Sequence, residues 1–215
     1  MHRSLLIGIV LVATGSSSAV LAHQPIISDG TAVAADQAIF LDDVQISRVV
    51  YHEVTEDAPQ VWLAFEVAEP QVLDLSLGVP KIYRLENFRP AYAIFGPGLP
   101  AFSGPIDAPQ GLGGLFFSTE EVMEPEVFDE PFSCTSSWIL DERQVDLPAA
   151  GRYYIVAFAP QGELGKLWIA PGIEEVFPLT EIFALMRSTR EVRAFHEVPR
   201  CRFLACMLQR RDRRD

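Results

Sequence analysis

The stretch that decides the fold is LPAAGRYYIVAFAPQG, which occupies residues 147–162. Its central run, Arg152–Ala159, is dominated by aromatic and β-branched residues, which pack well on a pleated surface and favour strands. The turn formers Pro148–Gly151 precede this run, and Gln161-Gly162 follows it. The stretch therefore predicts the strongest strand of the chain, with a turn at each end.

The region from residue 37 to residue 172 repeats this texture of short strand-forming runs and turns. Apolar residues alternate with others in Val61–Val67 and in Leu73–Leu77, so one face of each run is predicted to point into a core. Pro90–Gly96 is apolar on both faces, as expected for a central strand. Shorter strands are predicted at Arg48–Val54, Gly113–Ser118, Trp138–Leu140, Gln144–Leu147 and Lys166–Ala170, and a charged loop at Thr119–Glu130.

Roughly eight or nine closely spaced strands, with no helical period between them, predict an all-β fold. We expect an antiparallel, jelly-roll-like β-sandwich, because a βαβ architecture would need helices between the strands. The length of 215 residues fits one domain, and a hydrophobic content of 49% is enough for a substantial core. The net charge of −12 argues against nucleic acid as a partner.

Residues 1–22 have the pattern of a secretory signal peptide. A positive start is followed by the nine-residue apolar run Leu5–Ala13, and Val20-Leu21-Ala22 offers small residues before a cleavage site. An uncleaved membrane anchor is the alternative, but a spanning helix needs about 20 apolar residues. We therefore expect the mature chain to begin at His23 and to be exported to the periplasm or the extracellular space.

The two ends of the mature chain are predicted to differ from its middle. Residues 23–36 are expected to form an N-terminal arm, residues 173–199 a helical segment and residues 200–215 a basic tail. The helix is predicted to begin near Thr180 and to be amphipathic. Its apolar stripe comprises Ile182, Phe183, Met186, Thr189, Val192 and Phe195.

Charge is distributed unevenly between these parts. Residues 23–186 contain 7 Lys+Arg and 25 Asp+Glu, a net charge of −18, whereas residues 187–215 have a net charge of +5. We expect the helix to pack on the sandwich with its arginines facing carboxylates; contact with an anionic membrane surface is the alternative. Only Arg210–Asp215 is then expected to be disordered, because it has no apolar residue to anchor it.

The chain has three cysteines, Cys134, Cys201 and Cys206, so at most one intramolecular disulfide can form. Export would permit it, because disulfides persist in oxidising compartments. Cys201 and Cys206 are the closest pair in sequence, but the spacing does not decide the pairing.

Two segments resemble the bacterial pre-peptidase C-terminal domain. They are FRPAYAIFGPGLP at residues 88–100 and LPAAGRYYIV at residues 147–156. In that family a buried strand ends in Gly-Pro-Gly, and the closing hairpin reads Leu-Pro-x-x-Gly-x-Tyr-Tyr. The resemblance covers about residues 36–172, and the chain is also similar to exported bacterial proteins in which such a sandwich carries a helical C-terminal segment. The resemblance implies a β-sandwich that binds surfaces or accompanies secreted enzymes and is not itself catalytic.

No catalytic constellation is predicted. The sequence contains no Gly-x-Ser-x-Gly elbow and no His-Glu-x-x-His motif. Cys134 paired with His52 or His196 as nucleophile and base is no more than a chance combination of residue types. We therefore expect a non-enzymatic binding or interaction module, whose ligand is a polysaccharide or an envelope protein.

Aromatic residues are the candidate ligand-binding positions, because their rings can stack on sugars. The candidates are Trp62, Trp138 and Trp168. Trp62 lies on the strand face opposite Val61, Leu63 and Phe65, so it is expected either to cover a second layer or to be exposed. Most other aromatic residues are expected in the core.

Metal binding is the alternative, with copper or calcium as the cofactor. His23 at the mature N-terminus would offer copper an amine and an imidazole, and His52 or His196 would supply a second imidazole to a copper carrier or oxidoreductase. Calcium would need the six acidic residues of Thr119–Glu130, or Asp42-Asp43, because hard cations prefer oxygen ligands. The calcium-loop spacing is absent, so a solvated loop without cofactor is the preferred interpretation.

Overall fold

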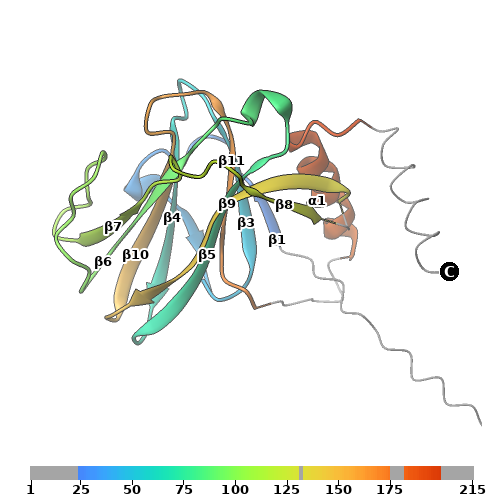
Figure 1. Ribbon diagram of the computed structural model, residues 1–215. Coiled ribbons are helices and arrows are strands. Elements are labelled where there is room, and N and C mark those ends of the chain that lie inside the picture. The colour runs from blue at the N-terminus through green and yellow to red at the C-terminus, as the bar shows by residue number, and fades with distance from the viewer. Residues whose placement is uncertain (1–23, 131–132, 175–181, 200–215) are drawn as a thin grey trace, which may run out of the picture.

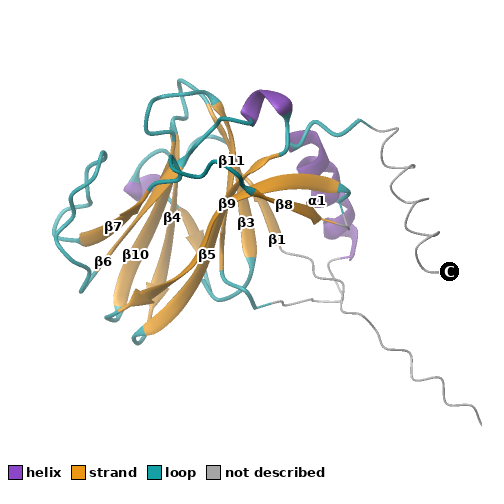
Figure 2. Cartoon of the chain, in the orientation of Figure 1, coloured by secondary structure: helices purple, strands orange, loops and turns teal. Residues whose placement is uncertain are grey.

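The computed structural model describes residues 24–130, 133–174 and 182–199. Two β-sheets stack face to face and a single α-helix lies beside them, which confirms the predicted fold class (Figure 1, Figure 2). The helix is α1 (Ile182–Phe195), and two short 3-10 helices are η1 (Ala35–Gln37) and η2 (Tyr83–Leu85). The strands are β1 (Gln24–Ile27), β2 (Ile39–Leu41), β3 (Arg48–Val54), β4 (Gln60–Val67), β5 (Gln71–Pro80), β6 (Ala91–Gly96), β7 (Gly113–Phe117), β8 (Glu126–Glu130), β9 (Thr135–Leu147), β10 (Gly151–Phe158) and β11 (Gly165–Pro171). Among the described residues, no helix is long and apolar enough to cross a membrane.

The two sheets have six and five strands. Their orders are β1-β3-β11-β5-β9-β8 and β2-β4-β10-β6-β7. Strand β1 pairs with β3, and β2 with β4, in parallel, and the other strand pairs are antiparallel. The strongest predicted strand, β10, lies in the middle of the five-stranded sheet and pairs along its whole length with β4.

The core lies between the sheets. The alternating side chains of β4 and β5 point inward as predicted, and Leu63, Phe65, Leu73 and Leu77 are completely buried. Each such side chain contributes about 1.5–3 kcal/mol of hydrophobic stabilisation. Strand β6 is buried at every position, as its two-sided apolar sequence predicts.

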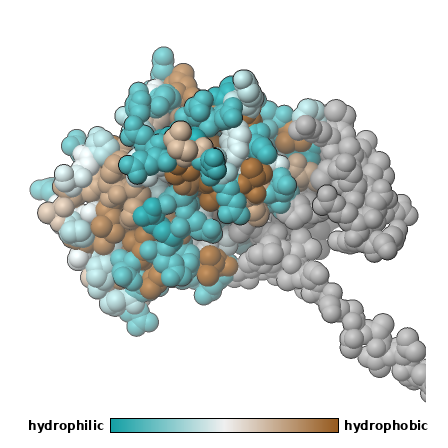
Figure 3. Space-filling view, in the orientation of Figure 1, coloured by the Kyte–Doolittle hydropathy of each residue, from teal (hydrophilic) through white to brown (hydrophobic). Residues whose placement is uncertain are grey.

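A second apolar cluster covers the outer face of the five-stranded sheet. Trp62 belongs to it, stacking on Phe95 with ring centroids 5.8 Å apart. Phe102 and Leu112, from the loop between β6 and β7, pack against the cluster. Figure 3 shows hydrophobic residues gathered over this side of the molecule, where Figure 1 places β6, β7 and β10.

Tyr153 joins the turn between β9 and β10 to the turn that follows β6. Its ring is fully buried and stacks on Phe65 with centroids 5.9 Å apart. Its hydroxyl lies 2.9 Å from the carbonyl oxygens of both Pro97 and Ala149 and accepts a hydrogen bond from the Ala149 N–H at 3.2 Å. Gly96 makes room for this ring, because a Cβ there would lie 2.0 Å from Tyr153 Cδ1.

Three predicted boundaries differ from the structure. The arm of residues 23–36 contains strand β1, because Gln24–Ile27 pairs with the exposed edge of β3. The loop Thr119–Glu130 ends in strand β8, which pairs with the first part of β9. Trp138–Leu140 and Gln144–Leu147 belong to one strand, β9, which has a register shift opposite Leu77/Gly78. Strand β1 and the full length of β9 depend on partner strands distant in sequence, β3 and β5, which short-range patterns do not reveal. Strand β8 pairs with the neighbouring β9, but its carboxylates hide the strand pattern.

Other expectations fall outside the described residues. These are the signal peptide of residues 1–22, the helix cap at Thr180, the basic tail of residues 200–215 and the expected disorder of Arg210–Asp215. The predicted helix itself is present as α1.

Tyr153→Phe should lower the free energy of unfolding by roughly 1–3 kcal/mol, because it leaves the buried polar groups of Pro97 and Ala149 without their partner. Urea unfolding followed by tryptophan fluorescence measures the change. Tyr154→Phe, on the opposite face of the same strand, is the control and should change stability by less than about 0.5 kcal/mol. Equal effects of the two variants would show that the Tyr153 hydroxyl is not the stabilising group.

Candidate functional site

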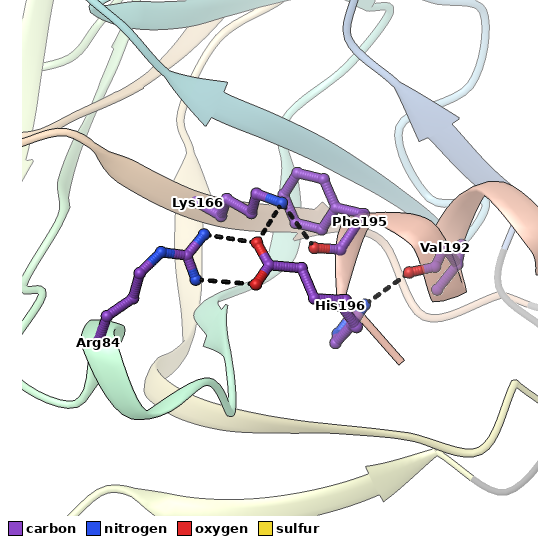
Figure 4. A network of polar contacts seen from close by, with 6 residues as sticks. Arg84, Lys166, Val192, Phe195 and His196 are labelled. Carbon is purple, nitrogen blue, oxygen red and sulfur yellow. Dashed lines mark hydrogen bonds and ion pairs between the residues drawn. The ribbon is translucent and has the colours of Figure 1, made fainter. Parts of the chain in front are cut away.

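The end of α1 meets the outer face of the six-stranded sheet in a network of polar contacts, which we call the helix junction (Figure 4). It consists of Arg84, Ser137, Lys166, His196 and Glu197. Apolar contacts border it, since Val192 and Phe195 are buried and the Phe195 ring packs edge-on against Tyr51 of β3 at 5.1 Å. The described part of the helix thus packs on the sandwich, as expected.

The helix ends in a tight backbone turn that aims the Glu197 carboxylate into the junction. The Val198 N–H bonds to the Arg193 carbonyl and the Glu197 N–H to the Ala194 carbonyl, both at 3.0 Å. Glu197 occupies the left-handed position, with φ 55°, where glycine is the usual residue. This conformation costs a non-glycine residue about 1 kcal/mol, which the ion pairs of its side chain offset.

Two cations hold that carboxylate. Arg84 forms a two-pronged contact with it, at 2.5 and 3.2 Å, and Lys166 donates to it at 3.0 Å. Lys166 is only 7% exposed and also donates to the carbonyl of Phe195 at 3.1 Å. Hydrogen bonds from Lys166 and then from Arg84 lower the pKa of Glu197, so its carboxylate is charged at neutral pH.

Ser137 and His196 form a hydrogen-bonded pair beneath the helix. His196 Nδ1 donates to the Val192 carbonyl at 2.9 Å, so Nε2 accepts from the Ser137 hydroxyl at 3.1 Å. This is the arrangement of a nucleophile and its base, but both residues are only 6% exposed and the helix closes them off from substrate. Burial, followed by the Lys166 charge, lowers the pKa of His196 to about 4. The pair is therefore a structural contact of the neutral imidazole.

Cys134 is disulfide-bonded and so cannot act as a nucleophile. The chain has only two other cysteines, Cys201 and Cys206, both outside the described residues, so the partner of Cys134 is one of these. The pairing of Cys201 with Cys206, which their closeness in sequence favours, is therefore wrong. The bridge also means that the β8–β9 hairpin is covalently joined to the C-terminal end of the chain.

Two histidines of the copper alternative, His52 and His196, have other hydrogen-bond partners in the described part of the chain. His52 is 1% exposed, and its ring nitrogens contact Ser28 Oγ at 3.2 Å and the Ala58 carbonyl at 3.0 Å. Gln24, which follows His23 in sequence, lies opposite Arg48, four strand residues or roughly 13 Å from His52. His196 is occupied in the helix junction, and His23 lies outside the described residues.

The structure does not bring the three tryptophans together as a stacking platform. Trp62 and Trp168 are 5% and 7% exposed, so neither offers a ring face to a sugar. Trp62 belongs to the outer cluster of the five-stranded sheet, whereas Trp138 packs against the main core. Trp168 lies in the six-stranded sheet, with its ring over Gly78. Trp62 is buried because residues of the loop between β6 and β7, among them Phe102 and Leu112, cover the outer face of its sheet.

The acidic positions considered for calcium are not grouped around a common point. Within residues 24–130, 133–174 and 182–199, no three His, Cys, Asp or Glu side chains are arranged to hold a metal ion. Asp43 accepts a hydrogen bond from the Gln45 N–H, and Asp129 accepts one from Ser136 Oγ. The acidic stretch is thus spread along an exposed loop and strand.

A second group of polar contacts, formed by Tyr92, Asp141 and Arg143, lies between β9 and the strands β6 and β7 of the other sheet. The Tyr92 hydroxyl donates to Asp141 Oδ2 at 2.5 Å, and Arg143 Nε donates to the same oxygen at 2.6 Å. The Arg143 guanidinium lies over the Phe117 ring, 4.2 Å from its centroid. Burial, and then the Asp141 carboxylate, raises the pKa of Tyr92. Tyr92, Asp141 and Arg143 thus serve as one another's hydrogen-bond partners, and we assign the group a structural role.

Strand β8 is the accessible feature that sequence reasoning missed. It lies at the edge of the six-stranded sheet and pairs only with β9 among the described residues (Figure 1). Val127 and Phe128 are 42% and 40% exposed, and Met123, in the loop before it, is 83% exposed. We call residues 120–130 the acidic edge, since they also contain six carboxylates. The strand-favouring pair Val127-Phe128 within EVFDE was the available signal, and the charge of the stretch outweighed it.

Acid should destabilise the protein through His196. As the pH falls from about 6.5 to about 4, His196 binds a proton in the unfolded chain but stays neutral in the folded protein. The free energy of unfolding therefore decreases across this window, by at most about 3 kcal/mol. Lys166 and Glu130 are the charged groups that act on the ring in the folded state. Urea unfolding at pH 7.0 and 4.5 should show a smaller loss for His196→Gln than for the unaltered chain. An equal loss would contradict the role of this histidine.

No protein family and no curated protein matches the sequence. Solved structures with similar folds include the pre-peptidase C-terminal domain of collagenase from Bacillus anthracis, at 10% identity, with 70% of this chain and 97% of that chain covered and a TM-score of 0.33. PliG from Aeromonas hydrophila, a periplasmic inhibitor of g-type lysozyme, has 15% identity, coverage of 71% and 100%, and a TM-score of 0.32.

A third similar structure is CorA of Methylomicrobium album BG8, a surface-associated copper-binding protein important in copper acquisition. It has 10% identity, coverage of 67% and 100%, and a TM-score of 0.37. None of these distant likenesses indicates what this chain binds.

Proposed function

We propose that this protein is an exported, non-enzymatic binding module that presents the acidic edge to a cationic protein partner. The observation that carries the proposal is the exposure of Val127 and Phe128 on a strand that, within the described part of the chain, has β9 as its one strand partner. An edge strand offers unpaired backbone N–H and C=O groups to an incoming extended segment. Exposed apolar side chains on that strand would add contact area to the same partner.

Charge supports a cationic partner over a polysaccharide. Residues 23–186 have a net charge of −18, and six carboxylates lie in the acidic edge itself. Such a surface attracts positively charged segments and repels acidic ones, which gives both speed and selectivity of association. A sugar-binding role lacks exposed stacking rings at Trp62 and Trp168.

Export is supported by two independent features. Residues 1–22 have the pattern of a signal peptide, and Cys134 is disulfide-bonded. Disulfides persist in oxidising compartments such as the periplasm and the extracellular space. The absence of a catalytic role is supported by the closure of the Ser137–His196 pair and by the bonded state of Cys134.

A fluorescent peptide with the sequence KVKVKVK tests the binding proposal, because it combines cationic residues with a strand-forming alternation. Fluorescence anisotropy at low salt should show saturable binding that weakens as salt is added. Glu124→Lys/Glu126→Lys should weaken it by about tenfold or more, equivalent to about 1.4 kcal/mol.

Glu69→Lys/Glu163→Lys is the matched control, because it changes the net charge equally on two exposed turns outside the acidic edge. It should change the affinity by less than about threefold, since only long-range electrostatics are altered. The proposal is wrong if the peptide does not bind, or if the control variant loses as much affinity as the edge variant.

A further inference from the structure

We infer that the chain's own basic tail, residues 200–215, occupies the acidic edge as a tethered competitor for the cationic partner. The inference rests on the proposed function in one respect, since it assigns the same surface to both occupants. Three features of the described residues carry it: where the chain leaves the helix, how it is joined to the hairpin, and the charge of the acidic edge.

The chain leaves the helix beside the β8–β9 hairpin. Arg193 donates from Nη1 to the Ser133 carbonyl at 2.8 Å and from Nη2 to the Pro199 carbonyl at 3.3 Å. Ser133 also bonds through its backbone N–H and its hydroxyl to the Glu130 carboxylate at the end of β8. Pro199, the last described residue, is therefore held next to the point at which the acidic edge ends.

A covalent bond fixes the tail at the same place. Cys134 is disulfide-bonded, and its partner is Cys201 or Cys206 because the chain has no other cysteine. From Cys206 to Asp215 the chain can extend by up to about 30 Å, and from Cys201 further. Strand β8 is five residues, or about 17 Å, long, so either bridge allows the tail to reach along it.

The compositions of the two segments are complementary. Residues 200–215 contain six arginines and two aspartates, a net charge of +4, and the acidic edge contains six carboxylates. The tail also has Phe203, Leu204, Met207 and Leu208 to set against the exposed Met123, Val127 and Phe128. A segment tethered this closely has an effective concentration in the millimolar range at the acidic edge. The tail is therefore favoured as the occupant over a second copy of the chain, or a free partner of similar affinity, at micromolar concentration.

Amide hydrogen exchange on the full chain tests the inference without any added ligand. The variant Arg210→Gln/Arg211→Gln/Arg213→Gln/Arg214→Gln keeps the disulfide and the apolar residues but removes the charge. Exchange of the amides of residues 126–129 should become about tenfold faster than in the unaltered chain, and the KVKVKVK peptide should bind about tenfold more tightly. Arg187→Gln/Arg190→Gln, on α1, is the control and should change neither quantity.

Unchanged exchange in residues 126–129 would overturn the inference, whether or not the peptide binds. Protection that increases with protein concentration would also overturn it, because the occupant would then be a second copy of the chain. Faster exchange without peptide binding by any variant would uphold the tail's position and contradict the proposed function instead.

Discussion

The contact on which the sandwich depends is the one between Tyr153 and two neighbouring turns at one end of the five-stranded sheet, the turn between β9 and β10 and the turn after β6. The ring fills the core against Phe65 and covers Gly96, while the hydroxyl bonds to Pro97 and Ala149. A single side chain thus joins the hairpin that precedes β10 to the turn that follows β6. Burying a polar hydroxyl is favourable here only because its hydrogen bonds are made, which fixes the two turns relative to the core.

This fixed core determines what the edges of the molecule can do. Strand β10 is paired on both sides, with β4 and β6, so these central strands have few free backbone groups for a partner. Features that can contact a partner are therefore expected on the outer strands and the helix. Glu197 illustrates the consequence at the helix junction, where a left-handed backbone is maintained because Arg84 and Lys166 hold its carboxylate. Strand β8, by contrast, has one strand partner among the described residues, and two of its apolar side chains are exposed. A rigid sandwich with an accessible acidic edge fits recognition better than catalysis.

The central strands and the helix could be predicted from sequence because their signals are local. Apolar alternation identifies β4 and β5, and the spacing of Val192 and Phe195 identifies the buried stripe of α1. The edge strands β1 and β8 could not: β1 forms only where β3, about 24 residues away, offers its backbone groups, and β8, although it forms a hairpin with β9, is too rich in carboxylates to show a strand pattern. Trp138, Trp168 and His52 were candidate site residues by type alone, whereas Trp62 was one by its place on the strand face. Tertiary packing buries Trp62, Trp168 and His52 and partly buries Trp138, which local patterns do not reveal. The Ser137–His196 pair joins residues 59 positions apart, which no spacing pattern connects.

Native-state amide hydrogen exchange across the whole chain tests the central role of the Tyr153 contact most directly. If that contact holds the sandwich together, the amides of β10 exchange only through global unfolding, with the free energy measured by urea. Those of α1 and β8 then exchange through smaller openings at lower free energy. Exchange of the β10 amides at a lower free energy than those of α1 would contradict it.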